Sequence, residues 1–239
     1  MGGVEVACRA AQSGREALKG GGVHRVSILE DGIGPKKILA LGAHADDIEI
    51  GCGGTILRFL DENPATEVVW VVLGASGQRR TEAVESAHLF LANARRKEVV
   101  VKEFRDGYFP YVGTEIKDFF EDLKRKYVPD LILTHYRNDL HQDHRLVSEL
   151  TWNTFRNHLI LEYEIVKYDA DLGAPNFFVH LTESIARKKI QTIVGCFNSQ
   201  RDKSWFTEDV FSSILRLRGV ESNAPDKYAE AYYCRKIVY

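Results

Sequence analysis

Residues 38–49 read ILALGAHADDIE and join a short apolar run to a loop of histidine and aspartate. Four consecutive apolar residues, 38–41, are typical of a strand that is buried on both faces of a parallel sheet. Beyond the loop, apolar side chains recur with helical spacing within residues 50–60. The folded part of the sequence is therefore predicted to begin with a strand, a polar loop and a helix.

The same alternation continues along the chain. Further strands are predicted at 68–73, 99–101 and 131–135, and further helices at 81–93, 116–127 and 144–157. The last third of the chain is predicted to hold a strand at 163–168, a helix at 181–194 and a strand at 232–238. Four alternations of strand and helix imply an α/β fold, with a mostly parallel sheet and helices on both faces.

Composition limits both the class of the protein and its function. The 239 residues are 44% hydrophobic and 28% charged, so the chain can bury a sizeable core and is neither a disordered nor a disulfide-scaffold protein. A net charge of −2 is too small for a broad nucleic-acid or membrane-surface field. We expect a flexible segment at 1–22, which ends in three glycines, and a single domain at 23–239.

The cysteines and the apolar runs bear on the location of the protein. Four scattered cysteines form no C-x-x-C pair, which argues against a disulfide framework and against a cysteine zinc site. No apolar run approaches the roughly 18 residues of a membrane span, and no signal-peptide pattern opens the sequence. These features favour a cytoplasmic protein without an integral membrane segment, and they indicate no particular oligomeric state.

Two clusters of histidine and aspartate follow predicted strands. His44, Asp46 and Asp47 come directly after the first strand, and residues 141–144 (HQDH) come shortly after the fourth. Ligands of open parallel sheets bind at the carboxyl ends of the strands, where the loops converge. We therefore expect the two clusters to meet in one site.

These residue types suit a catalytic metal ion. His44, Asp47 and His144 together offer two imidazoles and one carboxylate, a donor set that binds Zn²⁺ or Fe²⁺ and leaves a coordination position open. Asp46, which is not needed as a ligand, is then placed to act as a general base toward water. The competing interpretation is structural, with Asp46 and Asp47 capping the next helix.

The remaining residues of the second cluster receive supporting roles. His141 lies one helical turn before His144 and, as an imidazolium, would stabilise a developing oxyanion. Asp143 would fix the tautomer of a histidine, as metal-bound imidazoles usually require. Ser76, Arg79 and Arg80 follow the second strand at the same edge and are candidates for contact with an anionic or hydroxyl-rich substrate.

Two further features have competing interpretations. The glycines of residues 51–54 do not meet the G-x-G-x-x-G spacing, because Ile56 occupies the last position, so they are expected to permit close helix packing rather than dinucleotide binding. The aromatic loop 108–111 would either stack on a sugar ring or pack against the protein, and packing is favoured.

Both clusters resemble the motifs of one family. AHADDIE at 43–49 and HQDH at 141–144 are similar to the AHPDD-x-E and H-x-D-H motifs of the LmbE-like, or PIG-L, zinc deacetylases. Weaker similarities are GGT at 53–55 and KYAE at 227–230, and the likeness extends over roughly residues 36–235. Ala45 stands where the family has proline, which relaxes the loop without removing a ligand.

The resemblance implies a Rossmann-like fold and hydrolysis of an N-acetyl group on a glucosamine-type sugar. It implies His44, Asp47 and His144 as metal ligands, Asp46 as general base, His141 as the charge-stabilising histidine and Arg80 as a substrate contact.

From the sequence we expect a metal-dependent N-deacetylase with a small amino-sugar substrate. Alternatives are another metal-dependent hydrolase, acting on a different amide or a phosphoester with the same ligands, and a relative that binds sugar or metal without turnover.

Overall fold

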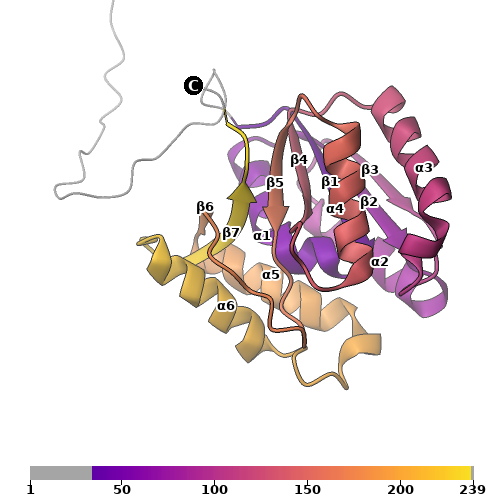
Figure 1. Ribbon diagram of the computed structural model, residues 1–239. Coiled ribbons are helices and arrows are strands. Elements are labelled where there is room, and N and C mark those ends of the chain that lie inside the picture. The colour runs from indigo at the N-terminus through magenta and orange to yellow at the C-terminus, as the bar shows by residue number, and fades with distance from the viewer. Residues whose placement is uncertain (1–33, 238–239) are drawn as a thin grey trace, which may run out of the picture.

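The computed structural model describes residues 34–237, and the predicted segment 1–22 lies outside them. One seven-stranded sheet forms the centre, in the order β3-β2-β1-β4-β5-β7-β6 (Figure 1). Its strands are β1 (Lys37–His44), β2 (Glu67–Gly74), β3 (Arg96–Val101), β4 (Leu131–His135), β5 (Leu159–Tyr163), β6 (Phe177–Leu181) and β7 (Tyr228–Cys234). The five strands β3-β2-β1-β4-β5 are parallel, whereas β7 runs antiparallel to both β5 and β6.

Helices cover both faces of the sheet, as predicted. They are α1 (Asp47–Glu62), α2 (Gly77–Phe90), α3 (Gly113–Lys126), α4 (Gln142–Thr154), α5 (Glu183–Cys196) and α6 (Glu208–Glu221), with short 3₁₀ turns η1 (Phe109–Val112) and η2 (Asn198–Gln200). Successive β1 side chains divide between two cores. Ile38 packs in the core that includes α1, α2, α5 and α6, and Leu39 packs in the core formed with α3 and α4.

The predictions for the last third of the chain were partly wrong. The strand expected at 163–168 lies earlier, at Leu159–Tyr163, and β6 and α6 were not predicted. β6 is a short strand at the edge of the sheet, and its sequence FFVHL shows no strict alternation of apolar and polar residues. α6 did carry a signal, because Thr207 caps its first turn and apolar residues recur at helical spacing behind it.

A buried ion pair holds α1 against the C-terminal strand. The Glu230 carboxylate accepts hydrogen bonds from the backbone N–H groups of Gly54 (2.8 Å) and Thr55 (2.6 Å) and pairs with Lys189 Nζ at 2.6 Å. Lys189 also donates to the carbonyl oxygen of Ile50 at 2.6 Å. These contacts fix the helix whose first residues carry the site.

The glycines at the start of α1 permit close packing, as the sequence predicted. A Cβ atom at Gly51 would lie 2.1 Å from Cδ2 of the fully buried Tyr163 ring. Gly51→Ala is therefore expected to lower the free energy of unfolding by about 1–3 kcal/mol. Gly195→Ala is the matched control, because nothing lies within 4 Å of a Cβ there, and it should stabilise α5 by up to about 1 kcal/mol. Denaturant unfolding of both variants measures the difference, and equal stabilities would contradict this packing.

Within residues 34–237, no helix combines the length and the apolar character that a membrane crossing requires.

Candidate metal centre

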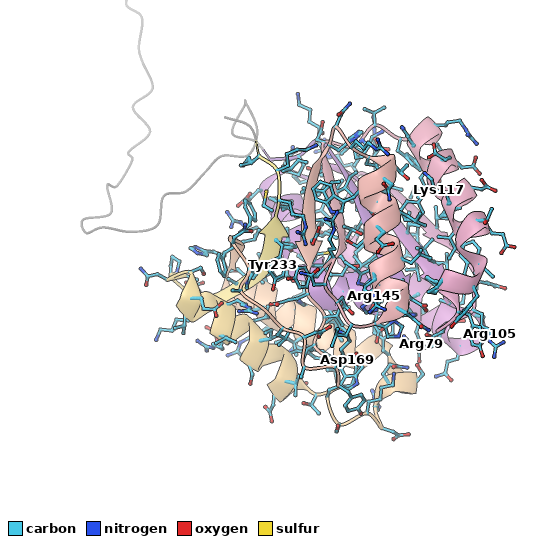
Figure 2. All side chains as sticks on the ribbon, in the orientation of Figure 1. Arg79, Arg105, Lys117, Arg145, Asp169 and Tyr233 are labelled. Atoms are coloured by element: carbon cyan, nitrogen blue, oxygen red, sulfur yellow. The ribbon has the colours of Figure 1, made fainter. Side chains whose placement is uncertain are left out.

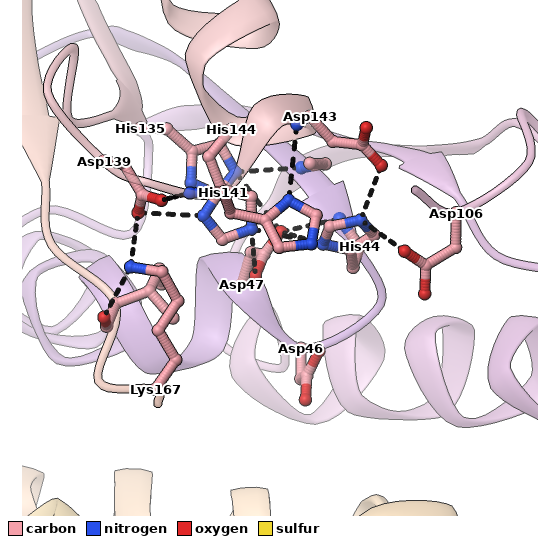
Figure 3. A network of polar contacts seen from close by, with 12 residues as sticks. His44, Asp46, Asp47, Asp106, His135, Asp139, His141, Asp143, His144 and Lys167 are labelled. Atoms are coloured by element: carbon pink, nitrogen blue, oxygen red, sulfur yellow. Dashed lines mark hydrogen bonds and ion pairs between the residues drawn. The ribbon is translucent and has the colours of Figure 1, made fainter. Parts of the chain in front are cut away.

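The site lies at the carboxyl end of the sheet, where β1 and β4 are neighbours. β1 ends at His44, β4 ends at His135, and α1 and α4 begin directly beyond the loops that follow these strands. The crossovers from β1 and β4 leave in opposite directions along the sheet, which makes this the topological switch point where α/β proteins bind ligands. The two predicted clusters meet here, although Asp47 and His141 are 94 positions apart in the sequence (Figure 3).

The donor atoms of the three predicted ligand residues lie close together, in what we call the triangle, and Asp47 faces the two histidines with different carboxylate oxygens. His44 Nδ1 lies 3.2 Å from His144 Nε2 and 3.4 Å from Asp47 Oδ2, and His144 Nε2 lies 3.5 Å from Asp47 Oδ1. Tetrahedral bonds of 2.0–2.1 Å to zinc place neighbouring ligand atoms about 3.3 Å apart. Two imidazole nitrogens and a carboxylate with this spacing therefore fit a divalent metal ion with one position left open.

The donor atoms around this triangle are crowded. Among residues 34–237, three overlapping groups have ligand atoms close enough to hold a metal ion: His44 with His141 and His144, Asp47 with His135 and His144, and His44 with Asp106 and Asp143. The predicted set of His44, Asp47 and His144 is not itself one of these groups, but each group shares at least one residue with it, so together they outline one candidate centre with several donors.

The outer nitrogen of His44 is held by carboxylates. His44 Nε2 lies 3.2 Å from Asp143 Oδ2 and 3.1 Å from Asp106 Oδ1. Asp143 is itself fixed, because it accepts hydrogen bonds from the backbone N–H groups of Gly107 (2.7 Å) and Phe109 (3.1 Å). A carboxylate on the outer nitrogen sets the tautomer that leaves Nδ1 free to bind a metal, which is the role predicted for Asp143.

The outer nitrogen of His144 is also held by a carboxylate. Its Nδ1 lies 2.9 Å from Asp139 Oδ2, and the same carboxylate oxygen pairs with Lys167 Nζ at 3.0 Å. Despite the burial of the group, His144 and Lys167 hold the pKa of the Asp139 carboxyl far below its usual range. Asp139 is therefore a carboxylate that can accept the Nδ1 proton and direct Nε2 of His144 toward the triangle.

The Asp47 carboxyl of the triangle is in the charge state that binds a cation, whereas His44 is not. Burial alone would raise the pKa of the Asp47 carboxyl, but the neighbouring imidazoles of His144, His135 and His44 lower it well below its usual range. Burial would lower the pKa of His44, but Asp47, Asp106 and Asp143 raise it well above the usual value, so a metal ion that binds His44 must displace a proton. An ionised Asp47 is the form in which a carboxylate binds a metal ion.

Asp46 stands beside the triangle without belonging to it. It occupies the N-cap position of α1 but makes no side-chain capping hydrogen bond, so the capping interpretation is wrong for Asp46. Instead, Arg79 Nη2 donates to Asp46 Oδ1 at 2.7 Å, and the Arg79 guanidinium also lies over the Phe197 ring. Asp46 is nearly buried and remains available for chemistry next to the ligands.

His141 faces both histidine ligands. Its ring centre lies 4.9 Å from that of His44 and 4.6 Å from that of His144. It is the N-cap of α4, where its Nδ1 accepts the backbone N–H of Asp143 at 3.3 Å, so a neutral ring carries its proton on Nε2. Burial and the charges of His144 and His44 lower the pKa of His141, which favours this neutral ring over the imidazolium that the sequence led us to expect.

The sequence of this region matches a known family. The family model described as "PIG-L: GlcNAc-PI de-N-acetylase" matches residues 39–155, a range that includes both histidine–aspartate motifs. Residues 39–155 belong to the PIG-L family.

One curated relative and two solved structures are similar to this chain. "Uncharacterized deacetylase YaiS" of Escherichia coli K12 is 29% identical over 123 residues, which are 48% of this chain and 65% of that protein, so the match spans less than two thirds of the relative. The N,N'-diacetylchitobiose deacetylase from Pyrococcus horikoshii is similar with a TM-score of 0.62 and 23% identity, covering 83% of each chain.

The second solved structure has a different reaction in its name. The 4-carboxy-2-hydroxymuconate hydratase GalB from Pseudomonas putida KT2440 is similar with a TM-score of 0.63 and 17% identity, covering 85% of this chain and 98% of that one. At these identities the likeness shows the fold alone. Because this PIG-L-like fold is found in a deacetylase and in a hydratase, the reaction must be argued from the site.

The predicted substrate contacts of the PIG-L segment lie in different surroundings. Arg79 reaches Asp46, whereas Arg80 Nη1 donates to the carbonyl oxygen of Val101 at 2.8 Å and lies 3.5 Å from a carboxylate oxygen of Glu103. Ser76 is exposed at the start of α2. The structure therefore brings Arg79 into the site and leaves Arg80 at its margin.

Several residues of the PIG-L site were missed by the sequence reasoning. They are His135, whose Nε2 lies 3.2 Å from Asp47 Oδ2 and whose ring stacks on His144, together with Asp106, Asp139 and Lys167. His135, Asp106 and Asp139 follow or end parallel strands, so the rule that located the two motifs also applied to them. Lys167 also follows a parallel strand, β5, but the sequence placed it inside the strand expected at 163–168 and not in the loop beyond it.

Proposed function

We propose that this chain is a metal-dependent N-deacetylase that hydrolyses the acetamide of an amino sugar or sugar conjugate. The observation that carries the proposal is the triangle of His44, Asp47 and His144, with Asp46 preceding Asp47 at the start of α1. Zinc is the metal that we favour, and iron(II) is the alternative, because both accept two imidazoles and a carboxylate. The PIG-L family description and the printed name of the curated relative support deacetylation as the reaction.

A metal ion held by His44, Asp47 and His144 would supply a Lewis acid that polarises the acetamide and makes water more acidic. The chain itself must then accept the proton of the attacking water, and we assign this to Asp46, which is neither a ligand of the triangle nor engaged in holding one of its histidines. Its ion pair with Arg79 fixes the orientation of the carboxylate before substrate arrives. When the C–N bond breaks, the proton held by Asp46 passes to the departing amine, and acetate is the second product.

His141 is placed to stabilise the oxygen that becomes negative during the attack. With Nδ1 occupied by the backbone N–H of Asp143, a neutral His141 presents its Nε2–H as a donor. A fixed, partly buried donor of this kind stabilises developing charge more than a solvent molecule does. Asp143 thereby has two positioning roles, since its side chain supports His44 and its backbone orients His141.

Substrate recognition is assigned to the residues at the open side of the triangle. Arg79 and Asp106 reach the site from opposite sides, one against Asp46 and one against His44, and both offer polar atoms to sugar hydroxyl groups. Ser76 and Arg80, at the start of α2, remain candidates for more distant parts of the substrate.

The test is release of acetate by the zinc-loaded chain from N-acetylglucosamine and its simple glycosides. Acetate above the level of the metal-free chain supports the proposal. Bound zinc without acetate from any acetamido sugar would overturn it in favour of a different amide, a phosphoester or a hydration reaction.

The contact between Asp139 and His144 gives a separate prediction. Asp139→Asn removes the carboxylate that accepts the Nδ1 proton, so we expect the Kd for zinc to rise by about 10–100-fold. The exposed Asp118→Asn on α3 is the matched control and should bind zinc as the unchanged protein does. Zinc titration against a competing chelator measures both, and an unchanged Kd in Asp139→Asn would refute the supporting role.

A further inference from the structure

The loop between β5 and β6, residues 164–176, reaches the candidate metal centre through a lysine. Lys167 Nζ lies 3.0 Å from Asp139 Oδ2, and the same oxygen lies 2.9 Å from His144 Nδ1. In Figure 3, Lys167 and Asp139 lie on the opposite side of His144 from His44. One carboxylate oxygen therefore joins the lysine of this loop to a proposed metal ligand.

The rest of Asp139 is held by its own loop and by α4. The backbone N–H of His141 donates to Asp139 Oδ1 at 2.7 Å, and Arg145 Nη1 donates to the carbonyl oxygen of Asp139 at 3.1 Å. Asp139 Oδ2, by contrast, has two hydrogen-bond partners among the described residues, His144 and Lys167. Only 2% of the Asp139 side chain and 10% of the Lys167 side chain are exposed. Removal of the lysine would therefore leave a buried carboxylate without the cation that faces it.

Asp171 holds the same lysine from the other side. Its carboxylate pairs with Lys167, four residues earlier, and its Oδ2 accepts the backbone N–H of Leu140 at 2.8 Å. Lys167 therefore binds the side chain of Asp139, and Asp171 binds the backbone of the residue that follows it. We call the turn 167–171, with its two charged ends, the clamp, because both ends bind consecutive residues of the loop after β4.

The backbone of the clamp is strained. Ala170 has a φ of 52°, in the left-handed region that disfavours a residue with a Cβ atom. Such strain persists where the surrounding contacts specify the conformation, and it is concentrated at functional sites. Figure 2 shows Asp169, next to Ala170, on the same side of the molecule as Arg145, the residue that follows His144. The turn is thus kept in an unfavourable conformation where its ends reach the metal centre.

We propose that Lys167 and Asp171 are positioning residues for the metal centre. They hold the Asp139 carboxylate against Nδ1 of His144, and so they keep Nε2 of His144 directed toward the triangle. Both residues lie beyond the range 39–155 that matches the family. The proposal rests on the metal centre proposed above and does not depend on which reaction that centre catalyses. The alternative is that the clamp only fastens one loop to another, which predicts a loss of stability without an effect on metal binding that passes through Asp139.

Lys167→Met tests the clamp, because methionine has a similar length but no charge and no hydrogen-bond donor. We expect the Kd for zinc, measured by titration against a competing chelator, to rise by roughly 3- to 30-fold. Lys167→Arg keeps the charge and the donors, so it should retain most of the affinity. Lys117→Met is the matched control, because Lys117 also pairs with a carboxylate four residues later and donates to Thr154, at the opposite end of α4 from His144. It should bind zinc as the unchanged protein does.

A double-mutant cycle separates positioning from a general loss of stability. If Lys167 acts through Asp139, Lys167→Met should have little effect on the Kd for zinc in a protein that already carries Asp139→Asn. If Lys167 is merely structural, the substitution should change the Kd by the same factor in both backgrounds. The same chelator titration measures all four proteins of the cycle.

Hydrogen exchange provides a second measurement, which uses the unchanged protein and so does not depend on the folding of a variant. Coupling between two sites is reciprocal, so zinc must stabilise the clamp by the factor by which the clamp favours zinc. The backbone N–H of Leu140 reports on the clamp because it donates to Asp171, and we expect zinc to slow its exchange by up to that factor. The backbone N–H of Ala65, which donates to the side chain of Asn63 before the amino end of β2, is the control and should be unaffected.

Any of three results would overturn the proposal: an unchanged Kd in Lys167→Met, an equal loss of affinity in the Asp139→Asn background, or exchange of the Leu140 N–H that zinc does not slow. Absence of zinc binding by the unchanged protein would overturn the metal centre and the role of the clamp together. Zinc bound without release of acetate would count against the proposed reaction alone, and the binding and exchange measurements would still decide on the clamp.

Discussion

Replacement of Asp46 by asparagine is expected to leave zinc bound and to reduce kcat by about 10²–10⁴-fold. Asparagine has the same shape and can still accept the hydrogen bond from Arg79, but its amide cannot take a proton from water. Asp46 is not part of the ligand triangle, so metal content should not change. Acetate release and elemental analysis on the same preparation measure the two properties together.

The exposed Asp118→Asn serves again as control and should keep both zinc and activity. A normal rate in Asp46→Asn would show that another group accepts the proton. Loss of zinc together with the rate would make Asp46 a ligand or a structural residue, and the assignment of a separate base would be abandoned.

His144→Ala should lose both the metal and the activity. The substitution removes one corner of the triangle and leaves Asp139 without its imidazole partner. At a free zinc concentration 100 times the Kd, binding stabilises the unchanged protein by about 2.7 kcal/mol, and this gain should be absent in the variant. Thermal unfolding with and without zinc therefore provides a readout that does not depend on knowing the substrate.

The control for His144→Ala is His88→Ala, since His88 is an exposed histidine on α2. It should bind one equivalent of zinc and be stabilised as the unchanged protein is. Stabilisation of His144→Ala by zinc to the same extent would mean that the metal is held by another of the overlapping donor groups, and the triangle would be the wrong site.

The parallel half of the fold was predictable because each buried strand is a continuous apolar run followed by a helical pattern. Residues 38–41 in β1 illustrate this, since both faces of that strand are covered by helices. The antiparallel edge was not predictable in the same way. β7 pairs with β5 and β6 through contacts that no local pattern specifies, and it begins at Tyr228 rather than near residue 232.

The positions of the predicted ligands followed from their close spacing in the sequence and from their place directly after parallel strands. His44 and Asp47 share one loop, and the sheet order brings His144 to them. The sequence did not specify whether Arg79 or Arg80 enters the site. Consecutive helical residues point about 100° apart, and the start of α2 was predicted four residues too late. Asp106 and Asp139 also lie in loops after parallel strands, but the sequence does not say which side chains of these loops fold back on the histidines.

Metal-dependent acetate release tests the central claim most directly. The full chain is stripped of metal with a chelator, zinc is added back in steps, and acetate from N-acetylglucosamine glycosides is measured at each step. The account predicts no acetate from the stripped chain and a rate that rises with zinc and levels off at about one equivalent per chain. Acetate at full rate from the stripped chain, or zinc bound at one equivalent without acetate from any of these glycosides, would contradict it.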